Sequence, residues 1–445
     1  MHLGLNSVAV VLACVAGLFV AQGTAAANDV TGPVTFTKDV LPILQENCQE
    51  CHRPSGGNLS GMVAPMSFMS YAEARPWAKA IAREVEAKRM PPWFASEEFH
   101  GIFELERALS KEEIATLMTW AKTGARRGNP QDAPPKRKFA SISGWTMGEP
   151  DIVIFMPEPY WVDDDVEDIQ PRFSTVLTED QLPEDKWIHW IEFRPGSEIV
   201  HHGGARVQPL DENGEPVIDP ISGGKIIGTA PGDGPDVWPE GYGKLIRKGS
   251  RITFGLHYHK EPGPGTGMWD QSMIAIKWHE KPVKYVVRAA GVSSRGWEVP
   301  PYHSAWQVGA ARTFEEDTYI INMMPHMHWR GGAAKYEAIY PDGTSEVLLE
   351  VPDYNFDWQL TYTYKDPKFL PAGTRLEVSM WFDNSEDNYW VPDPERPVGF
   401  GSMTNDEMNI GWTEYANATP IEDILSHDFG TEGTGVEDID DEELD

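Results

Sequence analysis

Histidines form three close pairs in the C-terminal two thirds of the chain, and one methionine follows them. The residues are His201, His202, His257, His259, His326, His328 and Met408. Imidazole and thioether groups together select copper over most other metals. The pattern therefore predicts copper ligands.

A Cys-x-x-Cys-His motif, Cys48, Cys51 and His52, lies upstream. Thiols at this spacing form thioethers to haem vinyl groups, and the following histidine binds the iron. A bare Cys-x-x-Cys could instead be a redox dithiol, but the adjacent histidine and the lack of a thioredoxin-like strand pattern favour haem c. We expect Met90, which follows a predicted helix and precedes two prolines, as the sixth iron ligand, with His100 as the alternative.

The chain is strongly acidic, with 69 acidic and 37 basic residues and a net charge of −32. Such a charge argues against nucleic acid or an anionic membrane surface as partner. Eight of the acids lie within residues 431–445, so we expect an acidic tail over 421–445.

The N-terminus has the pattern of a secretory leader. Residues 8–20 are apolar and Ala25, Ala26 and Ala27 supply a small-residue cleavage site, so we expect a signal peptide over 1–27 and a periplasmic or secreted protein. The apolar stretch is too short to span a bilayer, and no later segment is long enough. Removal of the leader leaves only the two cysteines of the motif and hence no structural disulfide.

Helical patterns surround the cysteine motif, and strand patterns follow. Residues 38–44 and 72–88 have helical spacing, and Ser110 with Glu113 forms a capping box for a third helix. We expect a cytochrome c domain over 28–128 and a Pro-rich linker over 129–150. Strand-length apolar or alternating runs occupy residues 151–156, 187–193, 251–259, 273–278, 284–289, 318–323, 334–340, 345–351 and 375–382. They fit two β-sandwiches, over 151–285 and 286–420.

The histidine spacing is informative once placed on strands. Residues two apart point to the same face, so His257 with His259, and His326 with His328, suit two cis ligands on one ion. Adjacent residues point to opposite faces. His201 and His202 can therefore share a metal only where the strand kinks or ends, and the two glycines at 203–204 offer such a place.

At these residues the chain resembles a known family. The His201-His202 doublet, His257 before Tyr258, the segment 324–331 and Met408 look like the ascorbate-dependent type II copper monooxygenases, which include peptide-amidating and dopamine-hydroxylating enzymes. The region over 28–128 is similar to class I-like bacterial cytochrome c modules.

The resemblance implies two jelly-roll-like β-sandwiches, each holding one copper ion, across a solvent cleft. His201, His202 and His257 would bind the electron-transfer copper, and His259 would be an alternative or outer ligand. The oxygen-binding copper would have a second set of ligands: His326, His328 and Met408.

The chain departs from the family at informative positions. Met324 stands where the peptide-amidating branch has an arginine that anchors a peptide carboxylate, and Trp412 replaces a tyrosine. A glycine-extended peptide is therefore disfavoured and a more apolar substrate is expected. Arg330 and Glu407 have two interpretations, as residues of the cleft or as an ion pair at a turn.

The sequence thus predicts an α plus all-β protein, with a small helical cytochrome c domain followed by two jelly-roll-like β-sandwich domains. We expect a haem c-linked monooxygenase with two copper ions, which hydroxylates a C–H bond of a small, rather apolar organic molecule with dioxygen. Electrons would pass from a protein or ascorbate-like donor and the haem to the coppers. The alternative is a non-catalytic copper and haem electron-transfer protein.

Overall fold

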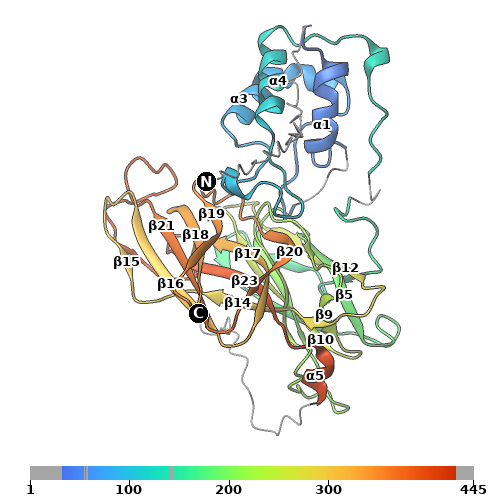
Figure 1. Ribbon diagram of the computed structural model, residues 1–445, viewed down its shortest axis with the longest axis vertical. Helices are drawn as coiled ribbons and strands as arrows, with labels where there is room; N and C mark the ends of the chain where they lie inside the picture. The colour runs from blue at the N-terminus through green and yellow to red at the C-terminus, as the bar shows by residue number, and fades with distance from the viewer. Residues whose placement is uncertain (1–32, 55, 57–58, 140–143, 427–445) are drawn as a thin grey trace, which may run out of the picture.

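The computed structural model describes residues 33–54, 56, 59–139 and 144–426. The predicted leader and residues 427–445 of the predicted tail lie outside the described residues. Figure 1 shows a group of helices stacked at one end of a larger β body. No helix within the described residues is both long and apolar enough to cross a bilayer.

The helical group packs around one small apolar core. Phe36, Val40, Leu44, Leu117 and Trp120 are all buried in it. As predicted, the Ser110 side chain accepts a hydrogen bond from the backbone N–H of Glu113, and the Glu113 side chain bonds back. The elements are η1 (Phe36–Val40), α1 (Leu41–Asn47), α2 (Tyr71–Ala74), η2 (Arg75–Trp77), α3 (Ala78–Glu86), η3 (Glu97–Phe99), α4 (Lys111–Lys122) and η4 (Pro130–Asp132).

The first β-sandwich consists of a six-stranded and a five-stranded sheet, with a short ribbon beside them. The six-stranded sheet contains β1 (Ile152–Phe155), β12 (Met273–Trp278), β5 (Lys186–Arg194), β9 (Tyr242–Ile246) and β13 (Tyr285–Val286), with β8 (Asp236–Val237) beside β5. The five-stranded sheet contains β3 (Asp168–Ile169), β10 (Arg251–His259), β6 (Val200–Gln208) and β7 (Gly224–Thr229), with β4 (Arg172–Val176) beside β10. The ribbon pairs β2 (Tyr160–Val162) with β11 (Met268–Asp270).

The second sandwich has two four-stranded sheets and a second ribbon. One sheet contains β14 (Arg288–Val292), β23 (Ile410–Asn417), β17 (Thr318–His326) and β20 (Tyr362–Leu370). The other contains β16 (Trp306–Phe314), β21 (Thr374–Phe382), β18 (Gly331–Ile339) and β19 (Ser345–Val351). The ribbon pairs β15 (Glu298–Val299) with β22 (Val398–Gly399).

Alternation along the strands decides which face of each sheet is buried. On β10, Ile252, Phe254, Leu256 and Tyr258 point into the core of the first sandwich. The intervening residues, which include His257, therefore point away from that core. This outward face of the five-stranded sheet carries the first set of predicted ligands.

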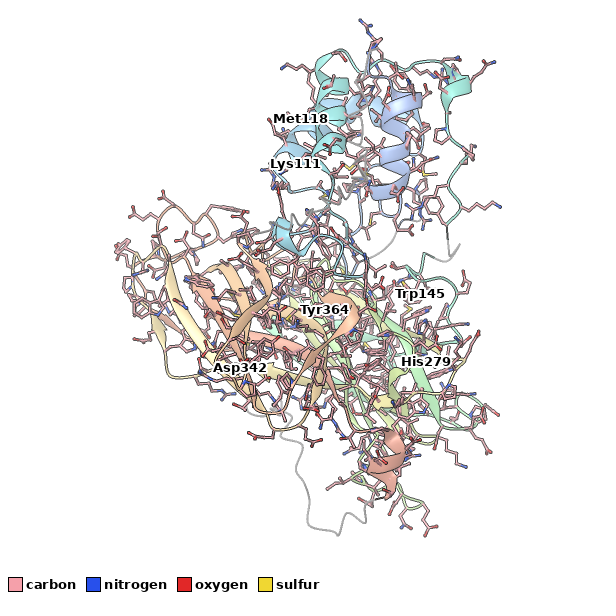
Figure 2. The ribbon with its side chains drawn as sticks, in the orientation of Figure 1. Lys111, Met118, Trp145, His279, Asp342 and Tyr364 are labelled. Atoms are coloured by element: carbon pink, nitrogen blue, oxygen red, sulfur yellow. The ribbon has the colours of Figure 1, made fainter. Side chains whose placement is uncertain are left out.

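A segment of the helical region is built into the second sandwich. Phe99 and Phe103 are buried in its core, and Phe103 forms a β-bridge with Tyr364. The rings of Phe103 and Tyr364 lie 5.0 Å apart, and Glu104 donates a backbone hydrogen bond of 2.7 Å to Thr363. Figure 2 shows Tyr364 on the side of the β body that faces the helices. The two parts therefore share apolar packing and backbone pairing.

The end of the described chain is also packed. Residues 421–426, which the sequence analysis assigned to the acidic tail, form helix α5 (Ile421–Ser426). Ile421 and Ile424 pack against Ile221, Leu245 and Val286 of the first sandwich. Two isoleucines in an acidic context account for this anchoring, because each can bury its side chain while the acids stay in water.

Candidate metal centre

The first ligand set lies on neighbouring strands β6 and β10. His202 pairs with His257, but Tyr258 pairs with Val200, so His201 is an extra residue in a β-bulge. A bulge changes the direction of a side chain, and this one lets two adjacent histidines reach one site. The predicted kink therefore exists, but it lies at His201 rather than at the glycines that follow, which stay in the strand.

The geometry of this set fits one metal ion. His257 Nδ1 and His202 Nε2 lie 2.9 Å apart, close to the separation of two cis nitrogens bonded to an ion at about 2.0 Å. One ligand atom from each of His201, His202 and His257 lies within 4.8 Å of the others. The Nδ1 atom of His201 is buried without a hydrogen-bond partner, so it has a lone pair or proton that only a ligand would satisfy.

Asp168, at the edge strand β3, orients His257. Its carboxylate accepts a 2.6 Å hydrogen bond from His257 Nε2, which leaves Nδ1 facing His202. His259 Nδ1 lies 3.4 Å from the other carboxylate oxygen. Burial opposes ionisation of Asp168, but the hydrogen bonds to His257 and His259 outweigh it and lower the pKa of the carboxyl. His257 and His259 thus contact the same carboxylate.

The second set lies where β17 ends and β23 begins. His326 is the last residue of β17 and pairs with Ile410, the first residue of β23. Continuation of this antiparallel register brings Met408 alongside His328. All three predicted ligands are buried, and all line the same cavity.

Hydrogen bonds fix the orientation of both imidazoles in the second set. His326 Nδ1 donates to the Gln359 side-chain oxygen at 2.6 Å, and His328 Nδ1 donates to the Asp406 carbonyl at 3.1 Å. The Nε2 atom of each ring is then the one available to a metal.

Arg330 and Glu407 hold the turn after His328. The Glu407 carboxylate accepts backbone N–H groups from His328 at 2.9 Å and Arg330 at 2.6 Å. The Arg330 guanidinium lies 3.9 Å from the same carboxylate and donates to Asn384 at 2.7 Å. Both side chains are buried and neither lines the cavity, so of the two interpretations the ion pair at a turn is correct.

Burial favours the neutral form of four of the histidines in the two sets. Burial, with repulsion from neighbouring histidines, lowers the pKa of His201 to about 3 and that of His202 well below its usual value. Burial also lowers the pKa of His326 to about 4 and that of His328 well below the usual range. Neutral imidazole is the form that binds metals, so these rings are ready for ligation at neutral pH.

The two sets are neighbours. The rings of His202 and His326 are perpendicular, with centroids 5.8 Å apart. Members of both sets line one cavity of about 260 Å³, together with Met324 and Trp412, the two positions of departure from the family. The two sets therefore share a cavity, where the resemblance implied a solvent cleft between them.

The cysteine motif follows α1 directly, and two contacts fix the orientation of its histidine. His52 Nδ1 donates to the Met66 carbonyl at 3.2 Å and the ring stacks on Phe68 at 4.4 Å, which leaves Nε2 for iron. Burial raises the pKa of the Cys48 thiol to about 12 and also raises that of Cys51. A redox dithiol needs a lowered thiol pKa, so these cysteines fit thioether formation better.

Met90 lies at the exit of α3, half-buried, before Pro91. Met66 packs beside Cys48, and its carbonyl accepts the hydrogen bond from His52 Nδ1. The assignment of Met90 as the sixth iron ligand stays a prediction. The alternative, His100, is exposed and contacts Glu106 at 2.5 Å.

Among the described residues, only His201, His202 and His257 form a group of three His, Cys, Asp or Glu side chains at metal-binding separation. The rings of His189 and His279 lie 4.8 Å apart, and His303 packs edge-on against Trp306. These histidines belong to neither ligand set.

Asp168 and Gln359 are the functional residues that the sequence analysis missed. Each orients a ligand histidine from a distant part of the chain. Nothing in their local sequence marks them, because acids are abundant and an isolated glutamine is common. Only the strand pairing of β3 with β10 brings Asp168 to its histidine.

No family model matches the chain, and no curated protein matches it. Among solved structures it is similar to PNGF-II at 9% identity and a TM-score of 0.27, over 60% of this chain and 65% of that chain. A cowpea mosaic virus particle protein gives 8% identity and a TM-score of 0.27, over 58% and 92% of the two chains. The chain thus spans slightly less than two thirds of the PNGF-II chain, and likeness at this level identifies neither a shared fold nor a function.

Proposed function

We propose that this protein is a copper monooxygenase that hydroxylates a C–H bond with dioxygen, with haem c as an internal electron donor. One observation carries the proposal: two members of an all-imidazole set, His202 and His257, line the same cavity as a set of two imidazoles with a thioether. A thioether favours Cu(I), the form that reacts with dioxygen, whereas three imidazoles suit electron transfer. We also propose that the protein is periplasmic or secreted.

Copper, when bound, would supply oxygen activation and one-electron transfer. The protein's own groups hold and orient it: Asp168 keeps His257 Nδ1 free, and Gln359 does the same for His326 Nε2. Met408, which lies just before the neighbouring strand β23, would supply the soft ligand. The cavity admits a small molecule beside His326 and His328.

Haem c would be held by Cys48, Cys51 and His52, with Met90 completing the iron ligands. The direct packing of the helical part on the second sandwich supports a role in supplying electrons to the copper sites. Substitution of Met90 should slow turnover with a protein reductant and spare turnover with ascorbate. Equal loss with both donors would rule out the haem as donor.

We include in the proposal that both sandwiches are jelly-roll-like and that the chain belongs with the ascorbate-dependent copper monooxygenases. The support is the order of the ligands along the chain: a histidine doublet, a histidine before tyrosine, a His-Met-His segment and a later methionine.

The test is metal content combined with oxygen use. The full chain is loaded with copper and haem, and copper per chain, oxygen uptake and incorporation of labelled oxygen into a product are measured. Two copper ions per chain with labelled product support the proposal. One or no copper without uptake supports the non-catalytic electron-transfer protein. Peroxide without hydroxylated product indicates an oxidase.

A further inference from the structure

A series of aromatic rings leads from both ligand sets to the surface. The Phe356 ring is buried, with its centroid 5.1 Å from that of His201 and 6.5 Å from that of His328. It also contacts the Trp390 ring at 6.3 Å, and Trp390 packs against Tyr389 at 4.7 Å. Packed aromatic pairs have centroids about 4.5–7 Å apart, so the series is unbroken. It ends in solvent, because Tyr389 is 81% exposed.

Two loops of the second sandwich hold this series in place. Phe356 lies between β19 and β20, in the loop that also carries Gln359, and its carbonyl accepts a 3.2 Å hydrogen bond from the Gln359 side chain. Trp390 follows β21, and its backbone N–H donates to the Asn388 side-chain oxygen at 3.1 Å. The Asn388 amide donates in turn to the Trp329 carbonyl at 3.1 Å. Both loops are therefore anchored to segments that carry or orient the ligands.

The order of the rings suits electron transfer between the ligands and solvent. Tryptophan and tyrosine are the aromatic side chains that lose an electron most readily, whereas phenylalanine resists oxidation. Transfer through protein slows steeply with distance, so the packed Phe356 ring is a short bridge between Trp390 and the ligand imidazoles. Tyr389 can then return an electron to Trp390. None of these three residues is among those that line the cavity, so the path does not cross the space for a substrate.

Charge around the rings favours this path over another tryptophan near the ligands. Trp412 lines the cavity, but the Lys225 ammonium lies 3.7 Å from the centre of its ring. A cation over the ring interacts favourably with the neutral ring and opposes the loss of an electron. Tyr389 has the opposite environment, because burial and the negative charge of Asp357 raise the pKa of its phenol. A nearby negative charge stabilises an oxidised ring, so oxidation is directed to Trp390 and Tyr389.

We propose that Trp390 and Tyr389 supply electrons to the metal centre for the reduction of hydrogen peroxide when no organic substrate is bound. Reduction of one peroxide molecule to two water molecules breaks the O–O bond and takes up two electrons and two protons. Tyr389 gives one electron and the proton of its phenol O–H, and Trp390 gives one electron and the proton of its indole N–H. A small one-electron reductant of the ascorbate class restores each side chain with one electron and one proton. The inference rests on the proposed function, since it takes copper to be bound by the histidines.

The test maps oxidised side chains in the full-length chain loaded with copper and haem. Hydrogen peroxide is added without an organic substrate, and oxidised tryptophan and tyrosine residues are quantified by mass spectrometry. The haem-loaded chain without copper is the reference, because haem itself reacts with peroxide. Oxidation that depends on copper should appear at Trp390 and Tyr389. Exposed Tyr389 radicals on two chains should also couple through a new C–C bond, which gives dityrosine-linked dimers.

Trp161 and Trp269 are a matched pair of rings elsewhere on the surface. Their centroids lie 5.4 Å apart, and the side chains are 40% and 60% exposed. Trp390 is less exposed than either, so oxidants attacking from solvent would modify the matched pair first. Transfer through Phe356 should instead modify Trp390 and leave the matched pair intact.

Three variants test the order of the rings, with copper affinity measured for each. Trp390→Phe should abolish the copper-dependent oxidation of Tyr389, because the step next to Phe356 is lost. Tyr389→Phe should keep the oxidation of Trp390 and lose the dimers. Phe356→Leu should lower oxidation at both positions. Trp269→Phe is the control and should behave like the natural chain.

Equal modification of Trp390 and the matched pair in the natural chain would overturn the proposal. So would modification of Trp412 in place of Trp390, or undiminished oxidation of Tyr389 in Trp390→Phe. If the chain binds copper and forms a hydroxylated product but Trp390 stays intact, this inference alone is wrong. If Trp390 and Tyr389 are oxidised but no substrate is hydroxylated, the proposed function alone is wrong. A chain that binds no copper would overturn both.

Discussion

His202 and His326 stand at right angles, with 5.8 Å between their ring centroids, although 124 residues and two different sandwiches separate them. Each belongs to a different ligand set. An electron that moves between the sets therefore has a path through two adjacent rings and need not cross open solvent. Such a contact makes the relative placement of the two sandwiches part of the site.

Asp168→Ala should weaken copper binding at the all-imidazole set by about 10- to 100-fold, because His257 loses the carboxylate that fixes its orientation. Copper binding at His326, His328 and Met408 should be unchanged. Competition titrations with a Cu(I) chelator measure both sites. Asp342→Ala, in an exposed turn that does not line the cavity, is the control. Unchanged affinity in Asp168→Ala would mean that the carboxylate does not support the ligand.

Met408→Leu should lower Cu(I) affinity at the second set by about ten-fold or more and affect Cu(II) much less, since only the thioether is lost. The side-chain volume is nearly conserved, so stability should change by less than about 1.5 kcal/mol. Met327→Leu is a matched control, because Met327 lies between the two histidines but is buried in the core of the second sandwich. If both variants bound Cu(I) equally, Met408 would not be a ligand.

Glu192→Gln should stabilise the protein in a pH-dependent way. Burial raises the pKa of Glu192 from 4.5 to about 7. Because the folded pKa lies above that of the unfolded chain, ionisation costs stability as the pH rises from about 4.5 to about 7, and the full cost is present above that. Relative to the natural protein, the free energy of unfolding of the variant should be about 3 kcal/mol higher at pH 8 than at pH 4. Urea unfolding at both pH values measures this.

Glu184→Gln, at an exposed position just before β5, is the control for the same change of charge. If the free energies of unfolding of Glu192→Gln and the natural protein differed by the same amount from pH 4 to pH 8, burial would not raise the pKa of this carboxyl.

Phe103→Ala should destabilise the protein by about 3–5 kcal/mol, because the ring is fully buried in the second sandwich. Helix and strand signals should still unfold together. Circular dichroism and tryptophan fluorescence during denaturation measure both. Leu105→Ala, two residues away and 40% exposed, should cost less than about 1 kcal/mol. A similar small loss in Phe103→Ala would mean that the helical part is only loosely attached.

Local patterns predicted many elements well. The boundaries of β10, β12 and β19 agree with the runs seen in the sequence, since alternation of apolar residues is a local signal. The capping box of α4 was found for the same reason. The histidine pairs could also be singled out from the sequence, because their spacing along the chain is itself unusual, and their assignment as metal ligands stays a prediction.

Features that depend on pairing between distant strands were not predictable in detail. The bulge at His201 arises from the register between β6 and β10, and no residue type in β6 alone predicts it. The bridge from Phe103 to Tyr364 joins a loop of the helical region to β20, which local periodicity cannot reveal. The lining of the cavity likewise combines residues from distant strands, such as Arg172, Arg206 and Lys225.

The burial of Phe99 and Phe103 also bears on how such a chain can arise and diversify. Because these rings fill the β body from a stretch between two helices, a genetic exchange at the linker would not move a complete unit. After such an exchange, the β body would have a cavity in its core, and the helical part would expose two aromatic rings to solvent. The helical part and the β body should therefore be inherited together. Descendants that lose the helices should replace the packing of Phe99 and Phe103 with other apolar side chains near Tyr364.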